Sequence, residues 1–99
     1  MKYLVFAADC GAPNLRDEEV EEGDCLWQEL SPALRDDILD WNLRYAPIVL
    51  MDTQSRLLNL GLIQELDQQG LELAARIAAE LSPAKAKYYS EGLLRFLLP

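Results

Sequence analysis

Residues 14–25 hold the densest group of ionisable side chains in the sequence, with six acidic residues against one arginine. Like charges spaced this closely repel one another and resist compact packing, so we expect an exposed loop with at most one helical turn. Carboxylates at this density either serve solubility alone or attract a basic protein surface. The candidate partner-binding residues are therefore Asp17, Glu18, Glu19, Glu21, Glu22 and Asp24.

The same segment partly matches the pattern of a calcium-binding loop. With Glu18 in the first position, Glu22 falls at the fifth, Gly23 at the sixth and Glu29 at the twelfth. However, Val20 takes the third ligand position, and no convincing helix precedes the segment. We therefore expect no metal site.

The other reactive side chains form no recognisable catalytic pattern. The chain has no histidine, so a catalytic thiol would lack its usual base. We expect Cys10 and Cys25 to be small buried or half-buried thiols in a reducing compartment. Asp36 and Asp40 are one turn apart, as on any polar helix face. With no glycine-rich phosphate loop and no nucleophile elbow, we expect neither an enzyme nor a cofactor.

The charge balance excludes some classes of partner. Nine basic residues against 17 acidic ones give a net charge of −8, and the basic residues are scattered. Nucleic acid and anionic membranes repel such a chain, so we expect it to bind neither. The apolar run at residues 3–8 is too short for a signal peptide, and no stretch approaches the ~20 apolar residues of a membrane span. We expect a cytoplasmic protein.

The N-terminal half predicts one strand and one helix. Residues 3–8 are apolar and end at Gly11 and Pro13, which is typical of a buried strand covered by helices. Ser31 and Pro32 form a helix-start signal, and Pro47 is expected to end that helix at Ala46; residues 48–51 then form a connector. The face expected to be buried consists of Leu34, Ile38, Trp41 and Tyr45. Together with Trp27, the last two are either core residues or an aromatic hot spot.

A second helical region is expected from Thr53 to Leu81, capped by Asp52 or Thr53 and broken at Gly61 into helices over 54–60 and 62–81. Its buried stripe consists of Ile63, Leu66, Gly70, Leu73, Ile77 and Leu81. The opposite, polar face is expected to hold Glu65, Asp67, Gln68, Glu72, Arg76 and Glu80.

The C-terminal segment leaves two alternatives. Glu-Leu-Ser-Pro-Ala occurs at 29–33 and again at 80–84, which we interpret as reuse of a helix-start signal. A helix would then begin at Ser82. The alternating residues 85–89 instead favour a short strand that pairs with the first strand, followed by a helix from Ser90 to Leu98. The apolar end of the chain either docks on the core or forms a contact in a homo-oligomer.

These elements predict a single α+β domain over 1–99, mostly helical, with three to four helices on a short two-stranded sheet. Residues 30–35, with Ile38, Trp41-Asn42 and Tyr45, resemble a stretch of small uncharacterised bacterial proteins, some of which resemble immunity or antitoxin-like chains in size and charge. The resemblance covers about residues 24–90 and assigns no site residue. We expect a non-catalytic, inhibitor- or immunity-like interaction module for a basic partner. The alternatives are a self-associating structural protein and a small enzyme or ligand-binding protein.

Overall fold

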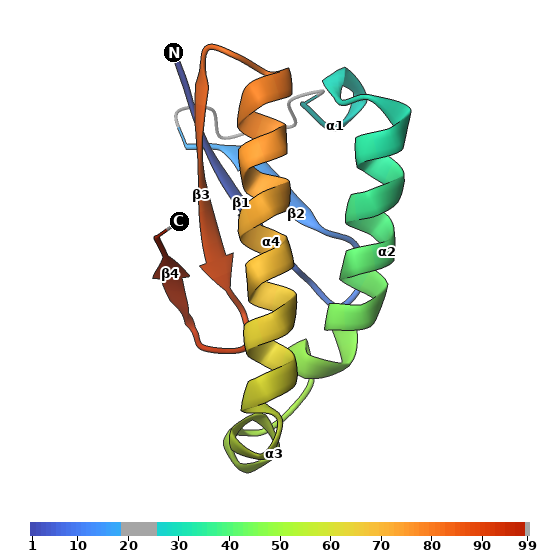
Figure 1. Cartoon of the computed structure of the whole chain (residues 1–99), viewed down its shortest axis with the longest axis vertical. Helices are drawn as coiled ribbons and strands as arrows, with labels where there is room; N and C mark the ends of the chain where they lie inside the picture. Colours follow the sequence, from blue (N-terminus) through green and yellow to red (C-terminus); the bar gives the residue numbers. More distant parts are fainter. Residues whose placement is uncertain (19–25, 99) are drawn as a thin grey trace.

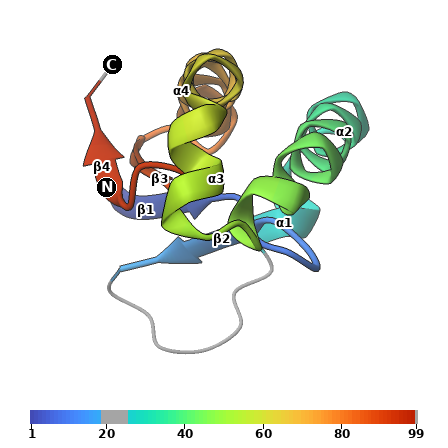
Figure 2. The ribbon, with the colours of Figure 1, turned by 90° about the horizontal axis from the view of Figure 1, so that it is seen from below.

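The computed structural model describes residues 1–18 and 26–98, which form two layers (Figure 1). Helices α2 and α4 lie on one side of a sheet, as the view from below shows (Figure 2). The elements in chain order are β1 (Lys2–Ala7), β2 (Asn14–Asp17), α1 (Leu26–Glu29), α2 (Pro32–Val49), α3 (Thr53–Leu58), α4 (Leu60–Glu80), β3 (Ala84–Ser90) and β4 (Arg95–Leu97). The α+β class is therefore confirmed.

Over residues 1–18 and 26–98, the sheet has four strands in the order β2-β1-β3-β4, so the expected two-stranded sheet is wrong. The predicted pairing of a strand near residues 85–89 with the first strand is confirmed, because β3 runs parallel to β1 with Phe6 opposite Tyr88. The two outer strands, β2 and β4, pair antiparallel with β1 and β3. Leu4 and Phe6 point toward the helices and are fully buried.

Strand β2 corrects the expectation of a loop over 14–25. Its residues continue the sheet beyond β1, with Arg16 opposite Val5 and Leu15 opposite Phe6. Leu15 packs against the core. The backbone hydrogen bonds of β1 and the burial of Leu15 outweigh the unfavourable local charge, because an unpaired buried strand edge is costly. Residues 19–25 lie outside the described residues.

Helix α2 begins as predicted, but it does not end at Pro47. The Ser31 hydroxyl accepts a hydrogen bond from the Leu34 N–H at 3.2 Å, which caps the helix. All four residues of the expected buried face are buried. Pro47 has no N–H to donate to the Leu43 carbonyl. Because Pro47 and Leu43 are both exposed, that carbonyl is open to water. Burial of Ile48 then holds the last turn in place.

The second helical region is also confirmed, with the break displaced. Asp52 caps α3 by accepting a hydrogen bond from the Ser55 N–H at 2.8 Å. The break falls at Asn59 instead of Gly61. The Asn59 side chain donates to the Ser55 carbonyl at 2.8 Å, which satisfies a carbonyl in the last turn of α3. Every residue of the expected stripe on α4 is buried.

The expected C-terminal helix from Ser90 is wrong. The Ser90 hydroxyl accepts from the Leu93 N–H at 3.0 Å, so it caps a turn instead of a helix. Leu94 then takes a left-handed conformation, with φ at 57°, which reverses the chain into β4. There the Phe96 ring contacts the ring of Tyr89 at 5.1 Å between centroids. Pairing with β3 decides the conformation here against the helical propensity of the leucines.

The repeated pentapeptide adopts two different structures. The first copy starts α2, whereas the second ends α4 and enters β3, so the alternative of a helix beginning at Ser82 is wrong and the favoured strand is present. The two copies touch: the Glu80 carboxylate accepts from the Ser31 N–H at 2.6 Å and from its hydroxyl at 2.7 Å. An anion at the N-terminus of α2 is also favoured by the helix dipole. In the described parts of the chain, no helix has the length and apolar character needed to cross a membrane.

Candidate functional site

A cluster of buried polar groups joins α2, α4 and β3. Its centre is the carboxylate of Asp67, which is only 2 % exposed. Oδ1 of Asp67 accepts hydrogen bonds from the hydroxyls of Tyr45 at 2.8 Å and Tyr88 at 2.6 Å, and Oδ2 accepts from that of Ser90 at 2.7 Å. The expectation that Asp67 lies on the polar face of its helix is therefore wrong.

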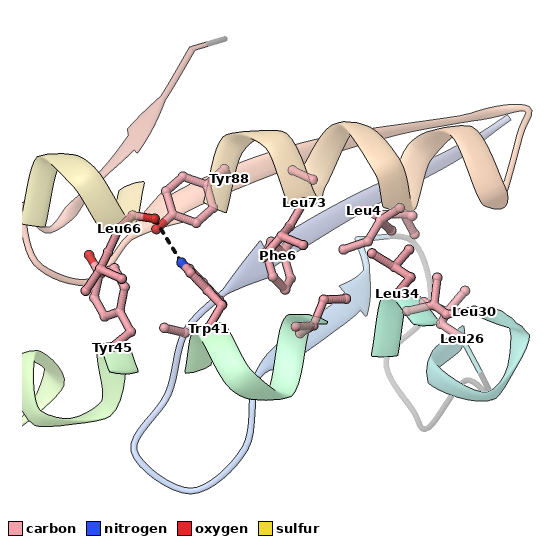
Figure 3. Close-up of a cluster of buried hydrophobic side chains, with 14 of the residues drawn as sticks. Leu4, Phe6, Leu26, Leu30, Leu34, Trp41, Tyr45, Leu66, Leu73 and Tyr88 are labelled. Carbon is pink, nitrogen blue, oxygen red and sulfur yellow. Dashed lines mark hydrogen bonds between the residues drawn. The ribbon is translucent and has the colours of Figure 1, made fainter. Parts of the chain in front are cut away.

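Neighbouring groups complete the hydrogen bonding of this cluster. The Gly92 N–H donates to the Tyr45 oxygen at 2.9 Å. One turn along α2, the Trp41 indole donates to the Leu66 carbonyl at 2.8 Å and so joins α2 to α4 (Figure 3). Gly70 gives the Tyr88 ring room, because an added Cβ would lie 2.5 Å from a ring carbon.

The cluster keeps its phenols protonated. Burial raises the pKa of Tyr45 to about 12, against a smaller lowering by the hydrogen bond with Ser90. Burial, followed by the hydrogen bond to Asp67, raises the pKa of Tyr88 strongly. A neutral phenol donates, and the carboxylate accepts. Because none of the cluster's buried side-chain polar atoms lacks a partner, we interpret the cluster as a tie between three elements.

A weak sequence signal marks Asp67. It follows Ile63 by four residues and precedes Gly70 by three and Ala74 by seven, so it lies beside the buried stripe. Its three donors come from distant elements, which spacing along one helix cannot reveal.

A second polar contact ties down the end of β1. The buried Asn42 amide donates to the Asp9 carbonyl at 3.0 Å and accepts from the Asp9 N–H at 3.0 Å.

Burial, and then the charge of Asp9, raise the pKa of Glu91. Cys10 is exposed, so the expectation of a buried thiol is wrong there, and Cys25 lies outside the described residues.

The structure places two of the six candidate acidic residues. Asp17 is half-buried in β2. The Glu18 carboxylate lies 3.1 Å from the Lys87 ammonium on β3, so it already has a cation. Glu19, Glu21, Glu22 and Asp24 lie outside the described residues, and partner binding by all six stays a prediction. Within residues 1–18 and 26–98, no three cysteine, aspartate or glutamate side chains are grouped to hold a metal ion.

Helix α2 carries a second apolar stripe that the sequence analysis missed. Leu39, Leu43, Ala46 and Leu50 recur at spacings of four, three and four, so the first three share one face of α2 and Leu50, the C-cap residue, continues it. The leucines are exposed, Leu43 to 74 % and Leu50 to 76 %. We call these four residues the outer stripe. The signal that reveals it is the same periodicity that predicts the buried face, displaced around the helix.

An apolar pocket of about 220 Å³ adjoins the outer stripe. Its walls come from the β1–β2 loop, β2, α1 and α2, and the residues are Ala12, Pro13, Leu15, Trp27 and Leu39. The three aromatic residues singled out in the sequence are thus separated, with Trp41 and Tyr45 in the core and Trp27 half-buried at this pocket.

Charges flank the outer stripe unevenly. By their positions on α2, Asp36 and Asp40 lie on one side of it, both exposed, while the half-buried Arg35 lies on the other. Asp40 contacts Arg44 at 3.4 Å across one helical turn. An exposed ion pair of this kind is weak, so Asp40 remains available to a partner.

Comparison of the chain with protein-family models, with curated proteins and with solved structures finds no match.

Proposed function

We propose that the chain is a non-catalytic protein-interaction module that binds a basic partner. The observation that carries this proposal is the outer stripe on α2. A helix at the surface of a domain needs one apolar face for the core, and α2 has two. Three leucines exposed along one face, beside an apolar pocket, are typical of a surface that another protein covers.

The charge of the chain supports a basic partner. The net charge is −8, and Asp36 and Asp40 lie beside the outer stripe. Opposite charge on a partner would speed association and make it depend on salt. An inhibitor- or immunity-like role would use such a surface, with the acidic residues Asp17 to Asp24 as a second contact. We place the module in the cytoplasm, where an exposed thiol such as Cys10 stays reduced.

Site-specific photo-crosslinking in the source cells tests this proposal. A photoreactive amino acid replaces Leu43 in one variant and Gln68, exposed on α4, in a matched control. We expect one discrete adduct with a basic protein from position 43 and none from position 68. Neutralising Asp36 and Asp40 to asparagine should weaken the adduct most at low salt. Equal labelling from both positions, or none from position 43, would contradict the proposal.

Self-association is the second candidate function, because the C-terminal strand also exposes apolar residues. Phe96 is 52 % and Leu98 is 89 % exposed. In a homo-oligomer, Phe96 and Leu98 would be buried against a second copy of the chain, although two chains of charge −8 repel each other. Sedimentation equilibrium at high salt decides the point: a monomer at millimolar concentration would dismiss it, and a dimer lost on Phe96→Ser would support it.

A further inference from the structure

The pocket beside the outer stripe has the size and chemistry of an anchor site for a single side chain. Its volume of about 220 Å³ is smaller than the ~300–1,000 Å³ of ordinary small-molecule sites. Within residues 1–18 and 26–98, its lining consists of the mainly apolar side chains of Ala12, Pro13, Leu15, Trp27 and Leu39. Among the described residues, these side chains offer a metabolite one polar group, the Trp27 indole N–H, whereas an aromatic side chain needs none to fix its orientation.

The pocket and the outer stripe form one continuous surface, because Leu39 belongs to both. From Leu39 to Leu50 the stripe covers three turns of α2, or about 16 Å. A partner helix with apolar residues at the same spacing would pack along this length, as helices do when side chains of one fill the grooves of the other. The end of the partner helix that lies over Leu39 would then reach the pocket.

The charges around this surface favour a basic helix over a second copy of the chain. A two-fold axis through the outer stripe would bring together two chains of charge −8. Asp36 and Asp40 would meet lysine or arginine side chains on one flank of a partner helix. Arg35, on the opposite flank, favours an acidic or polar residue there.

We propose that the partner contributes a basic amphipathic helix that lies along the outer stripe and inserts one large aromatic side chain into the pocket of Ala12, Pro13, Leu15, Trp27 and Leu39. This inference rests on the proposed interaction function and names the partner's chemistry. The aromatic anchor supplies affinity and the basic flank supplies orientation.

Three synthetic helical peptides of about 14 residues, long enough to cover the outer stripe, test the proposal. All carry leucines at the spacing of the stripe. The first has lysines on its flank and tryptophan at the anchor position, the second has alanine at that position, and the third has glutamates in place of the lysines. By fluorescence anisotropy we expect the first to bind about tenfold more tightly than the second, and the third not to bind.

Two variants and a control locate the binding. Ala12→Leu fills the pocket and should remove the tenfold preference for tryptophan while the alanine peptide still binds. Ala79→Leu, at an exposed alanine of α4, is the matched control and should keep that preference. Leu43→Asp should abolish binding of both lysine peptides. Because Ala12, Leu43 and Ala79 are exposed, all three variants are expected to fold.

The outcomes separate this inference from the function on which it rests. Equal binding of the tryptophan and alanine peptides, with loss of both on Leu43→Asp, would overturn the anchor and leave the interaction surface in place. Binding that survives Leu43→Asp, or equal binding of the glutamate peptide, would overturn the basic helix as occupant. Crosslinking from position 43 then decides the interaction function independently.

Discussion

Replacing Asp67 by alanine is expected to destabilise the fold by about 3–5 kcal/mol, because it leaves buried hydroxyl donors without an acceptor, at a cost of about 1–3 kcal/mol for each donor. Three hydroxyls, from Tyr45, Tyr88 and Ser90, donate to this carboxylate. Hydrogen bonds to a charged group contribute about 1.5–3 kcal/mol each. Relief from holding a charge away from water offsets part of that loss. Asp67→Asn keeps one acceptor oxygen, so we expect a smaller cost of about 1–2 kcal/mol.

Urea unfolding followed by tryptophan fluorescence measures this effect, because Trp41 lies in the core, with its ring 5.4 Å from that of Tyr45. With a slope of about 1.5 kcal/mol per molar urea, Asp67→Ala should lower the midpoint by about 2–3 M. Glu65→Gln, on the exposed face of the same helix, is the control and should change stability by less than about 0.5 kcal/mol. An unchanged or higher midpoint for Asp67→Ala would refute the structural tie.

Three further outcomes are expected. Folding raises the pKa of Tyr45 from 10.0 to about 12, so the phenol of the unfolded chain ionises first as the pH rises. The free energy of unfolding that this phenol contributes is present below pH 10 and is lost between about pH 10 and 12, by up to about 3 kcal/mol. Urea midpoints across this pH range test the expected loss, and a flat profile contradicts it. Gly70→Ala should lower the free energy of unfolding by about 2 kcal/mol despite better helix propensity, because the added Cβ would lie 2.5 Å from the Tyr88 ring. Gly61→Ala, where an added Cβ meets open space, should raise it by about 1 kcal/mol. Thermal unfolding that ranks the two variants otherwise would exclude the steric argument. Ser31→Ala should lower the free energy of unfolding by about 1 kcal/mol, because the helix cap is lost. Ser82→Ala, in the second copy of the pentapeptide, should lower it by less than about 0.5 kcal/mol. Equal urea midpoints for the two variants would contradict this expectation.

Local periodicity was sufficient to predict the helical layer. The spacing of Leu34, Ile38 and Trp41 is the one that a helix needs to bury one face against a sheet. Distant residues do not change which side chains of this face are buried. The apolar run of β1 and the cap at Ser31 are local signals of the same kind. These elements could therefore be read from residues within one or two turns of each other.

The outer strands and the polar cluster depend on distant residues. Residues 14–17 read as a charged loop, and they form a strand because β1 has an unpaired edge. The leucines after Ser90 favour a helix locally, but β3 offers them a pairing partner. Asp67 becomes a buried acceptor only when Tyr45 and Tyr88 arrive from other elements. None of these outcomes can be read from a single segment.

The outer stripe shows a different limit. The leucines at 39 and 43 follow the same helical period as the buried face, so a search for a single apolar face stops at the first one it finds. The sequence predicted the face that the core uses, but only the structure shows that the second apolar face of α2 is exposed. Candidate acidic residues 19 to 24, in contrast, stand out in the sequence, and their role stays a prediction.

The parallel pairing of β1 with β3 joins segments roughly 80 residues apart, which is a large separation for so short a chain. During synthesis the first strand leaves the ribosome long before its neighbour exists. Its apolar side chains and the edge that pairs with β3 therefore stay exposed, or bound by a chaperone, until residues 84–90 have emerged. A version cut short before residue 84 would lack this neighbour, and we expect it to aggregate instead of folding.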